Sequence, residues 1–245
     1  MRRERTDVLV VGSGAGGGTV ARRLIPLVER GMRVLVLEQG ARLAPEEFTG
    51  DELDMPPALY EDAGGFLTAD GAMTLAFGRA YGGSTAVYTG TSLQPPRRVI
   101  EGWDVPGLEH GDLVARTERY MAENHVHLLP DDEINENNRL FLEGCRRLGW
   151  EARRFPVNVK GCRGSSLCNL GCPNRAKQGT DRVQLPAAEA GGVEVVTRAQ
   201  VVRLRATGDG AAPATAVVRV HRKEGNGKGE ASSWEPGDYE VRAGT

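Results

Sequence analysis

Residues 7–40 read DVLVVGSGAGGGTVARRLIPLVERGMRVLVLEQG, and this stretch decides the fold. Val8–Val11 is an all-apolar run, as expected of a strand that is buried on both faces of a parallel sheet. A glycine-rich turn and a helix over 16–30 should follow, with a kink or an early end at Pro26. A second apolar run, Val34–Leu37, then predicts a second strand. The order strand, turn, helix, strand is typical of an α/β fold.

The turn carries the spacing GxGxxG at Gly12, Gly14 and Gly17. The first glycine permits the tight turn, the second lets the backbone approach a pyrophosphate, and the third lets the helix pack closely on the strand. The N–H groups and the dipole at the start of the helix favour a bound phosphate. This context predicts a dinucleotide site, the alternative being a glycine-rich turn that binds no dinucleotide.

Glu38 ends the second strand of this unit. A carboxylate at this position can accept hydrogen bonds from the 2′ and 3′ hydroxyls of a ribose, and it disfavours a 2′-phosphate. Glu38 is therefore the predicted ribose ligand.

The bulk composition excludes several classes of protein. The 245 residues include 31 basic and 33 acidic side chains, so the near-balanced charge gives no footprint for nucleic acid. No apolar run approaches the ~20 residues that span a membrane, so no membrane span is expected. The predicted first strand begins near residue 7, which leaves no room for a signal peptide, and we expect a cytoplasmic protein.

A second glycine-rich stretch, AFGRAYGGSTAVYTG, covers residues 76–90. Its glycines do not suit the interior of a helix or a strand. Small side chains and bare backbone are compatible with close approach to a flat or phosphorylated ligand, and equally with a glycine-rich surface loop. Residues 41–76, which precede it, show little periodicity and are interpreted as long loops over the core.

Apolar residues at helical spacing predict two helices, over 112–125 and 135–149, with Asp112 as a possible cap of the first. Together they resemble an insertion that is separate from the nucleotide core. A further helix is predicted at 183–192. The alternating segments 193–207, 214–223 and 239–243 predict strands, and the polar segment 224–238 a hairpin loop.

Three of the four cysteines, Cys162, Cys168 and Cys172, lie in one loop with C-x5-C-x3-C-P spacing. Three thiolates in a loop that ends in Cys-Pro resemble iron–sulfur ligands. The alternative is a set of small buried thiols, which is a common role of free cysteine. Cys145 is assigned to the core, because it lies on the apolar face of a predicted helix.

Four segments together resemble the glucose-methanol-choline (GMC) flavin oxidoreductases. They are VVGSGAGGGTVARRL with VLVLEQG, GRAYGGSTAVYTG, GCPNRAKQGTDRVQLPAAEAGG and VEVVTRAQVVRL. The second and third segments are more specific than the first, which would also fit other flavin or nicotinamide enzymes. The resemblance covers nearly the whole chain.

The resemblance implies FAD as the cofactor. The first glycine turn would hold the pyrophosphate, and Glu38 would bind the adenosine ribose. The 78–84 loop would run along the flavin and the pyrophosphate, and the backbone of Val201 would meet the adenine. The matching positions are Gly12, Ser13, Gly14, Ala15, Gly17, Glu38, Gly78, Arg79, Gly82, Gly83, Ser84 and Val201. The family usually has Asn where this chain has Tyr88.

The resemblance also implies a division of the chain. Residues 1–95 and 156–245 would form a discontinuous, Rossmann-like FAD-binding domain, with a parallel sheet and a β-meander. Residues 96–155 would be a helical insertion that belongs to the cap or substrate region.

Family members are about twice as long, so the chain resembles the N-terminal half and would be incomplete without the C-terminal half. None of His110, His125, His127 and His221 lies in a segment that matches the family's catalytic motif, so no catalytic residue is assigned. A complementary chain with the C-terminal half is the expected partner. The break at 245 would then reflect a nicked, naturally split or truncated protein.

Two functions follow. In the first, the assembled enzyme oxidises a sugar, sterol or other alcohol, a base on the other half takes the hydroxyl proton, and hydride passes to the flavin. In the second, the chain is a non-catalytic FAD-binding or electron-relay subunit.

Overall fold

The computed structural model describes residues 1–205, 214–223 and 227–244. The chain divides into two compact units. Unit 1 comprises Met1–Tyr88, Leu167–Arg175 and the described part of Gly179–Thr245. Unit 2 comprises Thr89–Ser166 and Ala176–Gln178. The boundaries of unit 2 are wider than the predicted 96–155 insertion, and the assignment of a function to each part stays a prediction.

A parallel sheet forms the centre of unit 1, as the apolar runs predict. Its strands are β2 (Val8–Val11), β3 (Val34–Leu37) and β8 (Glu194–Val196), in the order β2-β3-β8. All four residues of β3 are buried, since this strand has a neighbour on each side and a layer on each face. The α/β class with a parallel sheet is confirmed.

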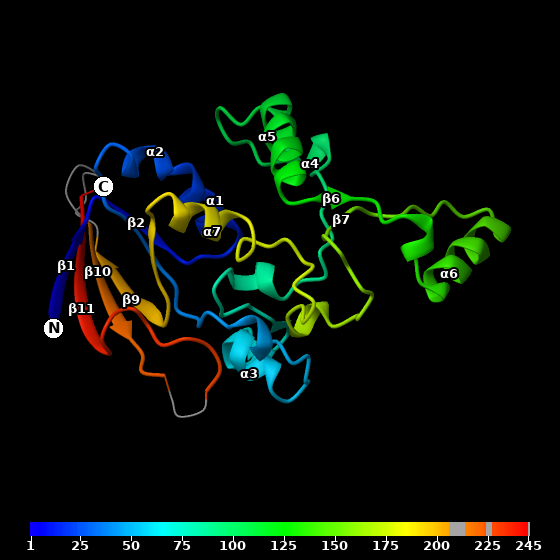
Figure 1. The fold of residues 1–245 in the computed structure, drawn as a ribbon. Helices are drawn as coiled ribbons and strands as arrows, with labels where there is room; N and C mark the ends of the chain where they lie inside the picture. Colours follow the sequence, from blue (N-terminus) through cyan, green and yellow to red (C-terminus); the bar gives the residue numbers. More distant parts are fainter. Residues whose placement is uncertain (206–213, 224–226, 245) are drawn as a thin grey trace. The chain divides into compact units, whose positions relative to one another are not determined.

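Two helices follow the glycine turn where one was predicted over 16–30. Helix α1 spans Ala15–Arg23 and α2 spans Ile25–Val28, and Pro26 lies in the first turn of α2. Proline is tolerated at that position because an N–H group in the first turn would have no partner within the helix. Helix α7 (Gln184–Ala190) falls within the predicted 183–192 and ends at Gly191. It packs beside α1 (Figure 1).

A four-stranded sheet forms the other layer of unit 1. It contains β1 (Arg2–Thr6), β9 (Ala199–Arg205), β10 (Ala214–Val220) and β11 (Gly237–Ala243), in the order β1-β11-β10-β9. The antiparallel part, β9-β10-β11, is the expected meander. Strand β1 was not predicted, because its charged sequence RRERT has no apolar alternation that would reveal its parallel pairing with β11.

The core of unit 1 follows from side-chain alternation along β3. Val34 and Val36 pack with Ala21 of α1 and Ala188 of α7. Leu35 and Leu37 point to the opposite face and pack with residues of the four-stranded sheet, among them Val218 and Val241. Because successive side chains of a strand point to opposite faces, the alternation along β3 lets the parallel sheet pack against helices on one face and against the second sheet on the other.

The prediction of a single strand over 193–207 is wrong. The segment contains β8 and β9, separated by Thr197 and by Arg198, whose φ of 57° lies in the left-handed region. The turn moves the chain from the parallel sheet to the meander. The predicted strand residues 206–207 and the loop residues 224–226 lie outside the described residues.

The remaining elements of unit 1 are short. The expected loops at 41–76 contain single turns and two-residue strands rather than purely irregular chain. The elements are η1 (Pro45–Glu47), α3 (Met55–Leu59), η2 (Glu61–Gly64), β4 (Phe66–Leu67), β5 (Thr74–Leu75), η3 (Gly83–Ala86) and η5 (Cys168–Leu170).

Unit 2 holds the two predicted amphipathic helices. Helix α5 spans His110–Glu123 and α6 spans Glu136–Arg147 (Figure 1). Glu109, not Asp112, is the N-cap residue of α5, so Asp112 lies in the first turn instead. The other elements are α4 (Arg97–Gly102), β6 (Val126–His127), η4 (Asp131–Glu133) and β7 (Val157–Asn158).

Cys145 is buried on α6, as expected of a core residue. None of the described helices is both long and apolar enough to cross a membrane.

Candidate functional site

The glycine turn adopts the geometry that its spacing predicts. Gly12 has a φ of 86°, which glycine adopts without strain. A Cβ atom on Gly17 would lie 1.8 Å from the carbonyl oxygen of Gly12 and 3.3 Å from Cγ1 of Val10. Helix α1 therefore starts directly against the end of β2, and only glycine allows this approach.

The start of α1 is open to a ligand. Gly14 is the N-cap residue and has no side chain with which to cap the helix, while Ala15 and Gly16 are exposed. The first N–H groups of any helix lack partners within the helix. Bare backbone, unfilled space beside Gly16 and the positive end of the dipole together fit a pyrophosphate.

The second glycine loop meets the first. Gly82 and Gly83 have φ values of 96° and 54°, and Gly83 begins η3. A Cβ atom on Gly83 would lie 2.8 Å from Cα of Gly14, so the two backbones touch. Ser84 is exposed, and its hydroxyl accepts a hydrogen bond from the Gly78 N–H at 2.9 Å. The structure thus brings together two loops that are more than sixty residues apart in the sequence.

Ser13 connects these loops to the acidic end of β3. Its hydroxyl donates to Oε2 of Glu38 at 2.6 Å and accepts from the Gly82 N–H at 2.9 Å. Its backbone N–H also donates to Oε2 of Glu38, at 2.8 Å. Ser13 is fully buried, so these bonds are shielded from water.

Glu38 directly follows β3, as predicted, and is bound by donors of the turn, while its contact with a ribose stays a prediction. It is only 6% exposed, and its Oε1 accepts a third hydrogen bond, from the Gly40 N–H at 2.7 Å. An ionised carboxylate offers about four acceptor positions. Glu38 therefore organises the turn with most of its acceptor capacity, which leaves room for about one bond to a ribose hydroxyl.

Thr180 is a connecting residue that the sequence did not single out. Its hydroxyl lies 3.1 Å from the carbonyl oxygen of Ser13 and 3.2 Å from that of Gly82. Its N–H donates to the hydroxyl of Thr85, which itself donates to Gly82. The related feature of the sequence is the glycine at position 18. A Cβ atom there would lie 2.7 Å from Cβ of Thr180, so glycine makes room for the threonine.

The remaining predicted cofactor residues are Arg79 and Val201. Arg79 forms an ion pair with Glu61 at 3.7 Å and lines a polar cavity of about 740 Å³, together with Gly40. Val201 lies on β9, which is an edge strand of the described meander sheet, so alternate backbone groups face away from β10. Such groups could meet an adenine, and this contact stays a prediction.

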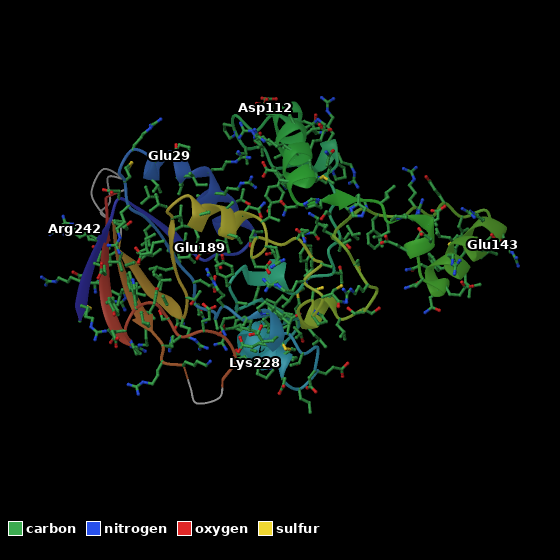
Figure 2. The ribbon with its side chains drawn as sticks, in the orientation of Figure 1. Glu29, Asp112, Glu143, Glu189, Lys228 and Arg242 are labelled. Atoms are coloured by element: carbon green, nitrogen blue, oxygen red, sulfur yellow. The ribbon has the colours of Figure 1, made fainter. Side chains whose placement is uncertain are left out.

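A partly buried cluster around Tyr81 connects the 78–84 loop to α7. The Tyr81 hydroxyl donates to Glu189 of α7 (labelled in Figure 2) at 2.6 Å. The guanidinium of Arg42 lies over the tyrosine ring and pairs with the same carboxylate. Burial, and then the hydrogen bond to Glu189, raise the pKa of Tyr81 far above its ordinary value. The phenol therefore stays protonated and has a structural role.

The iron–sulfur hypothesis gains no support. In residues 1–205, 214–223 and 227–244, no group of three or more His, Cys, Asp and Glu side chains could hold a metal. Cys162, Cys168 and Cys172 form no disulfide and are half-buried. Their spacing alone does not make a ligand set.

The comparisons with known proteins identify the family. The family model for the GMC oxidoreductases, described as "GMC oxidoreductase", matches residues 57–233. The chain belongs to the GMC oxidoreductase family. This membership confirms the resemblance.

Individual relatives agree with the family match. An uncharacterised GMC-type oxidoreductase of Mycobacterium tuberculosis is 39% identical over 206 residues, which cover 82% of this chain and 32% of that protein. A long-chain-alcohol oxidase of Arabidopsis thaliana is 32% identical over 80% of this chain and 26% of its own length. The chain thus spans about a third of the curated relatives it matches.

Solved structures share the fold. Pyridoxine 4-oxidase from Mesorbium loti matches with a TM-score of 0.64 at 18% identity, over 98% of this chain and 48% of that one. Formate oxidase from Aspergillus oryzae matches with a TM-score of 0.58 at 13% identity, over 98% and 44%.

Proposed function

We propose that this chain is the FAD-binding part of an enzyme that oxidises an alcohol. The observation that carries the proposal is the junction of the two glycine loops, where Gly14 and Gly83 touch beside the open start of α1. Family membership supports FAD as the ligand of this junction.

The residues of the junction would divide the work of holding the cofactor. The backbone of Gly14 and Ala15 and the start of η3 would bind the pyrophosphate, because both present N–H groups at the start of a helical turn. Glu38 would accept a hydrogen bond from the adenosine ribose with its remaining acceptor position. Ser13 and Thr180 would hold the two loops in register.

When bound, FAD supplies a hydride acceptor for the carbon that carries the hydroxyl group. The chain would fix the position of that acceptor before the substrate binds, which removes reorganisation from the chemical step. Proton removal requires a base, which we place on the remaining part of the protein or on a partner chain. This placement rests on the short share of the relatives' length that the chain spans.

The relatives favour an apolar alcohol. Several are named long-chain-alcohol oxidases, and a cholesterol oxidase of Mycobacterium tuberculosis is 25% identical over 83% of this chain. Both names describe alcohols with large hydrocarbon portions. We extend this class to the present chain as part of the proposal.

The test is to purify the chain together with any chains that copurify and to identify these by mass spectrometry. Alcohols are then added under anaerobic conditions. The proposal expects a bound FAD whose visible absorption band is bleached by an apolar alcohol. A bound flavin that no alcohol reduces, in an assembly with the C-terminal part present, would favour a non-catalytic FAD-binding or electron-relay subunit.

A further inference from the structure

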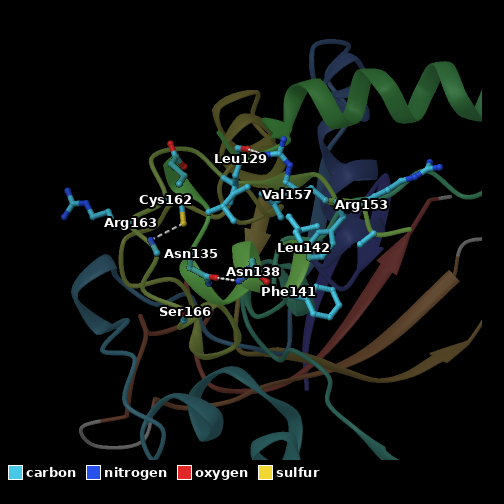
Figure 3. Close-up of a pocket in the computed structure, with 16 residues that line it drawn as sticks. Leu129, Asn135, Asn138, Phe141, Leu142, Arg153, Val157, Cys162, Arg163 and Ser166 are labelled. Atoms are coloured by element: carbon cyan, nitrogen blue, oxygen red, sulfur yellow. Dashed lines mark hydrogen bonds between the residues drawn. The ribbon is translucent and has the colours of Figure 1, made fainter. Parts of the chain in front are cut away.

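A second cavity lies entirely within unit 2, between α6 and the segment 152–166 (Figure 3). Its volume is about 580 Å³, within the usual range of roughly 300–1,000 Å³ for pockets that bind small molecules. The larger apolar side chains that line it are Leu129, Ile134, Phe141, Leu142, Phe155 and Val157.

Three of the polar residues that line this cavity already have hydrogen-bond partners, which are backbone groups or carboxylates outside the lining. Asn135 accepts the Asn138 N–H at 2.9 Å and so caps α6. Arg154 donates to the carbonyl oxygen of Leu129 and pairs with Asp131 at 2.6 Å. Arg153 pairs with Glu151. The rest of the lining is mainly hydrocarbon, with Glu133, Arg163 and Ser166 among its other polar members.

Two of the charged side chains in the lining point away from this apolar wall. In Figure 3 the side chains of Arg153 and Arg163 extend outward in opposite directions, while Leu129, Leu142 and Val157 lie together. A sugar would need polar partners inside the cavity, since a hydroxyl without a hydrogen bond in an apolar pocket is costly. An aliphatic chain needs none.

The wall also contains apolar surface that a ligand could cover. Phe141 is 66% exposed and Phe155 is 55% exposed, although both line the cavity. Burying apolar area stabilises a complex by roughly 25 cal/mol per Å². Two exposed aromatic rings at the same cavity therefore favour a ligand with a long hydrocarbon portion.

We propose that this cavity binds the aliphatic chain of an alcohol. The inference rests on the proposed function for the identity of the ligand as a substrate, but the binding of the chain itself does not require the flavin. Cys162 gives a direct probe, because it lines the cavity and is a free, half-buried thiol.

The experiment measures alkylation of Cys162 by iodoacetamide in the full chain, with and without 1-dodecanol, by peptide mass spectrometry. Cys168 is the internal control, since it is also half-buried but does not line the cavity. At a dodecanol concentration ten times its Kd, the rate at Cys162 should fall about tenfold while that at Cys168 is unchanged. Glucose at the same concentration should protect neither. Equal rates at Cys162 with and without dodecanol would overturn the inference.

A variant pair separates binding from general effects of the alcohol. Leu142→Gln puts an amide into the lining and should abolish the protection, whereas Leu140→Gln alters the same helix outside this cavity and should preserve it. Circular dichroism checks that both variants fold, and Phe141→Ala replaces Leu142→Gln if that variant does not. Protection that survives in the lining variant would contradict the assignment.

The outcome is distinguishable from failure of the proposed function. Protection of Cys162 by dodecanol, without flavin reduction by any alcohol in the complete assembly, would keep this cavity and reject the enzyme. Flavin reduction by alcohols without protection would keep the enzyme and reject this cavity.

Discussion

Oε2 of Glu38 accepts two hydrogen bonds from the same residue, from the Ser13 N–H at 2.8 Å and from the Ser13 hydroxyl at 2.6 Å. The two residues lie at the ends of neighbouring strands of the parallel sheet. Their contact joins the phosphate-binding turn to the residue that would meet the ribose.

Ser13→Ala tests this contact. The change removes a hydroxyl that serves Glu38 and leaves the Gly82 N–H without that acceptor in a buried site. We expect a loss of about 1–3 kcal/mol in the free energy of unfolding, measured by urea denaturation, together with weaker FAD binding. Thr19→Ala on α1 is the control and should leave FAD affinity nearly unchanged. Wild-type stability of the Ser13 variant would show that the bond is dispensable.

Gly17→Ala and Gly16→Ala form a matched pair. The new methyl group at position 17 would lie 1.8 Å from the Gly12 carbonyl oxygen, whereas at position 16 nothing lies within 4 Å. The first variant should lose at least about 3 kcal/mol of stability or fail to fold, since the backbone must move. The second should be neutral or gain about 0.5–1 kcal/mol, because alanine favours a helix. Thermal melts of both variants decide, and equal melting temperatures would contradict the close packing.

Thr180→Val tests the connection between the two glycine loops and the segment that contains Thr180, GCPNRAKQGTDRVQLPAAEAGG. Valine keeps the shape of threonine but removes the hydroxyl that lies between the carbonyl oxygens of Ser13 and Gly82. We expect a loss of about 1–3 kcal/mol and slower FAD association, because the two glycine loops lose their common partner. Thr180→Ser, which restores the hydroxyl, should recover FAD association. A valine variant with unchanged association would assign Thr180 to packing alone.

Glu47 should make the free energy of unfolding depend on pH in the acidic range. Burial raises the pKa of this carboxyl, but hydrogen bonds from the N–H groups of Gly229 and Ala44 outweigh burial and hold the pKa below its ordinary value. A depressed folded pKa gives stability that is present above the unfolded value of about 4.3 and is lost as pH falls through the folded value. Glu47→Gln should therefore flatten the loss of stability below that pH. Glu29→Gln, at an exposed position of the same unit, should not, and identical acid profiles for the Glu47 variant and the wild type would reject the effect.

The parts of the fold that local sequence controls could be predicted. Val8–Val11, the glycine turn and Val34–Leu37 form one continuous unit, and their period and spacing suffice. Strand β1 could not be predicted, because its partner β11 lies more than 230 residues away and its own residues are mostly charged.

The candidate site shows the same limit. Gly12 and Gly17 act through backbone geometry that the spacing reveals. The roles of Ser13 and Thr180 depend on contacts across 69 and 167 residues of sequence, which no local pattern shows. The cysteine spacing suggested a metal site in the same local manner, and the described residues do not bring such a site together.

The central claim is that the junction of Gly14 and Gly83 holds FAD. Its most direct test is titration of the folded chain with FAD and with FMN, followed by flavin fluorescence anisotropy, for the wild type and for Gly83→Ala. The account predicts one FAD per chain, much weaker binding of FMN because it lacks the adenosine that Glu38 would hold, and loss of FAD binding in the variant, whose new methyl group would lie 2.8 Å from Cα of Gly14. Equal binding of FMN and FAD, or full FAD binding by a folded Gly83→Ala chain, would contradict it.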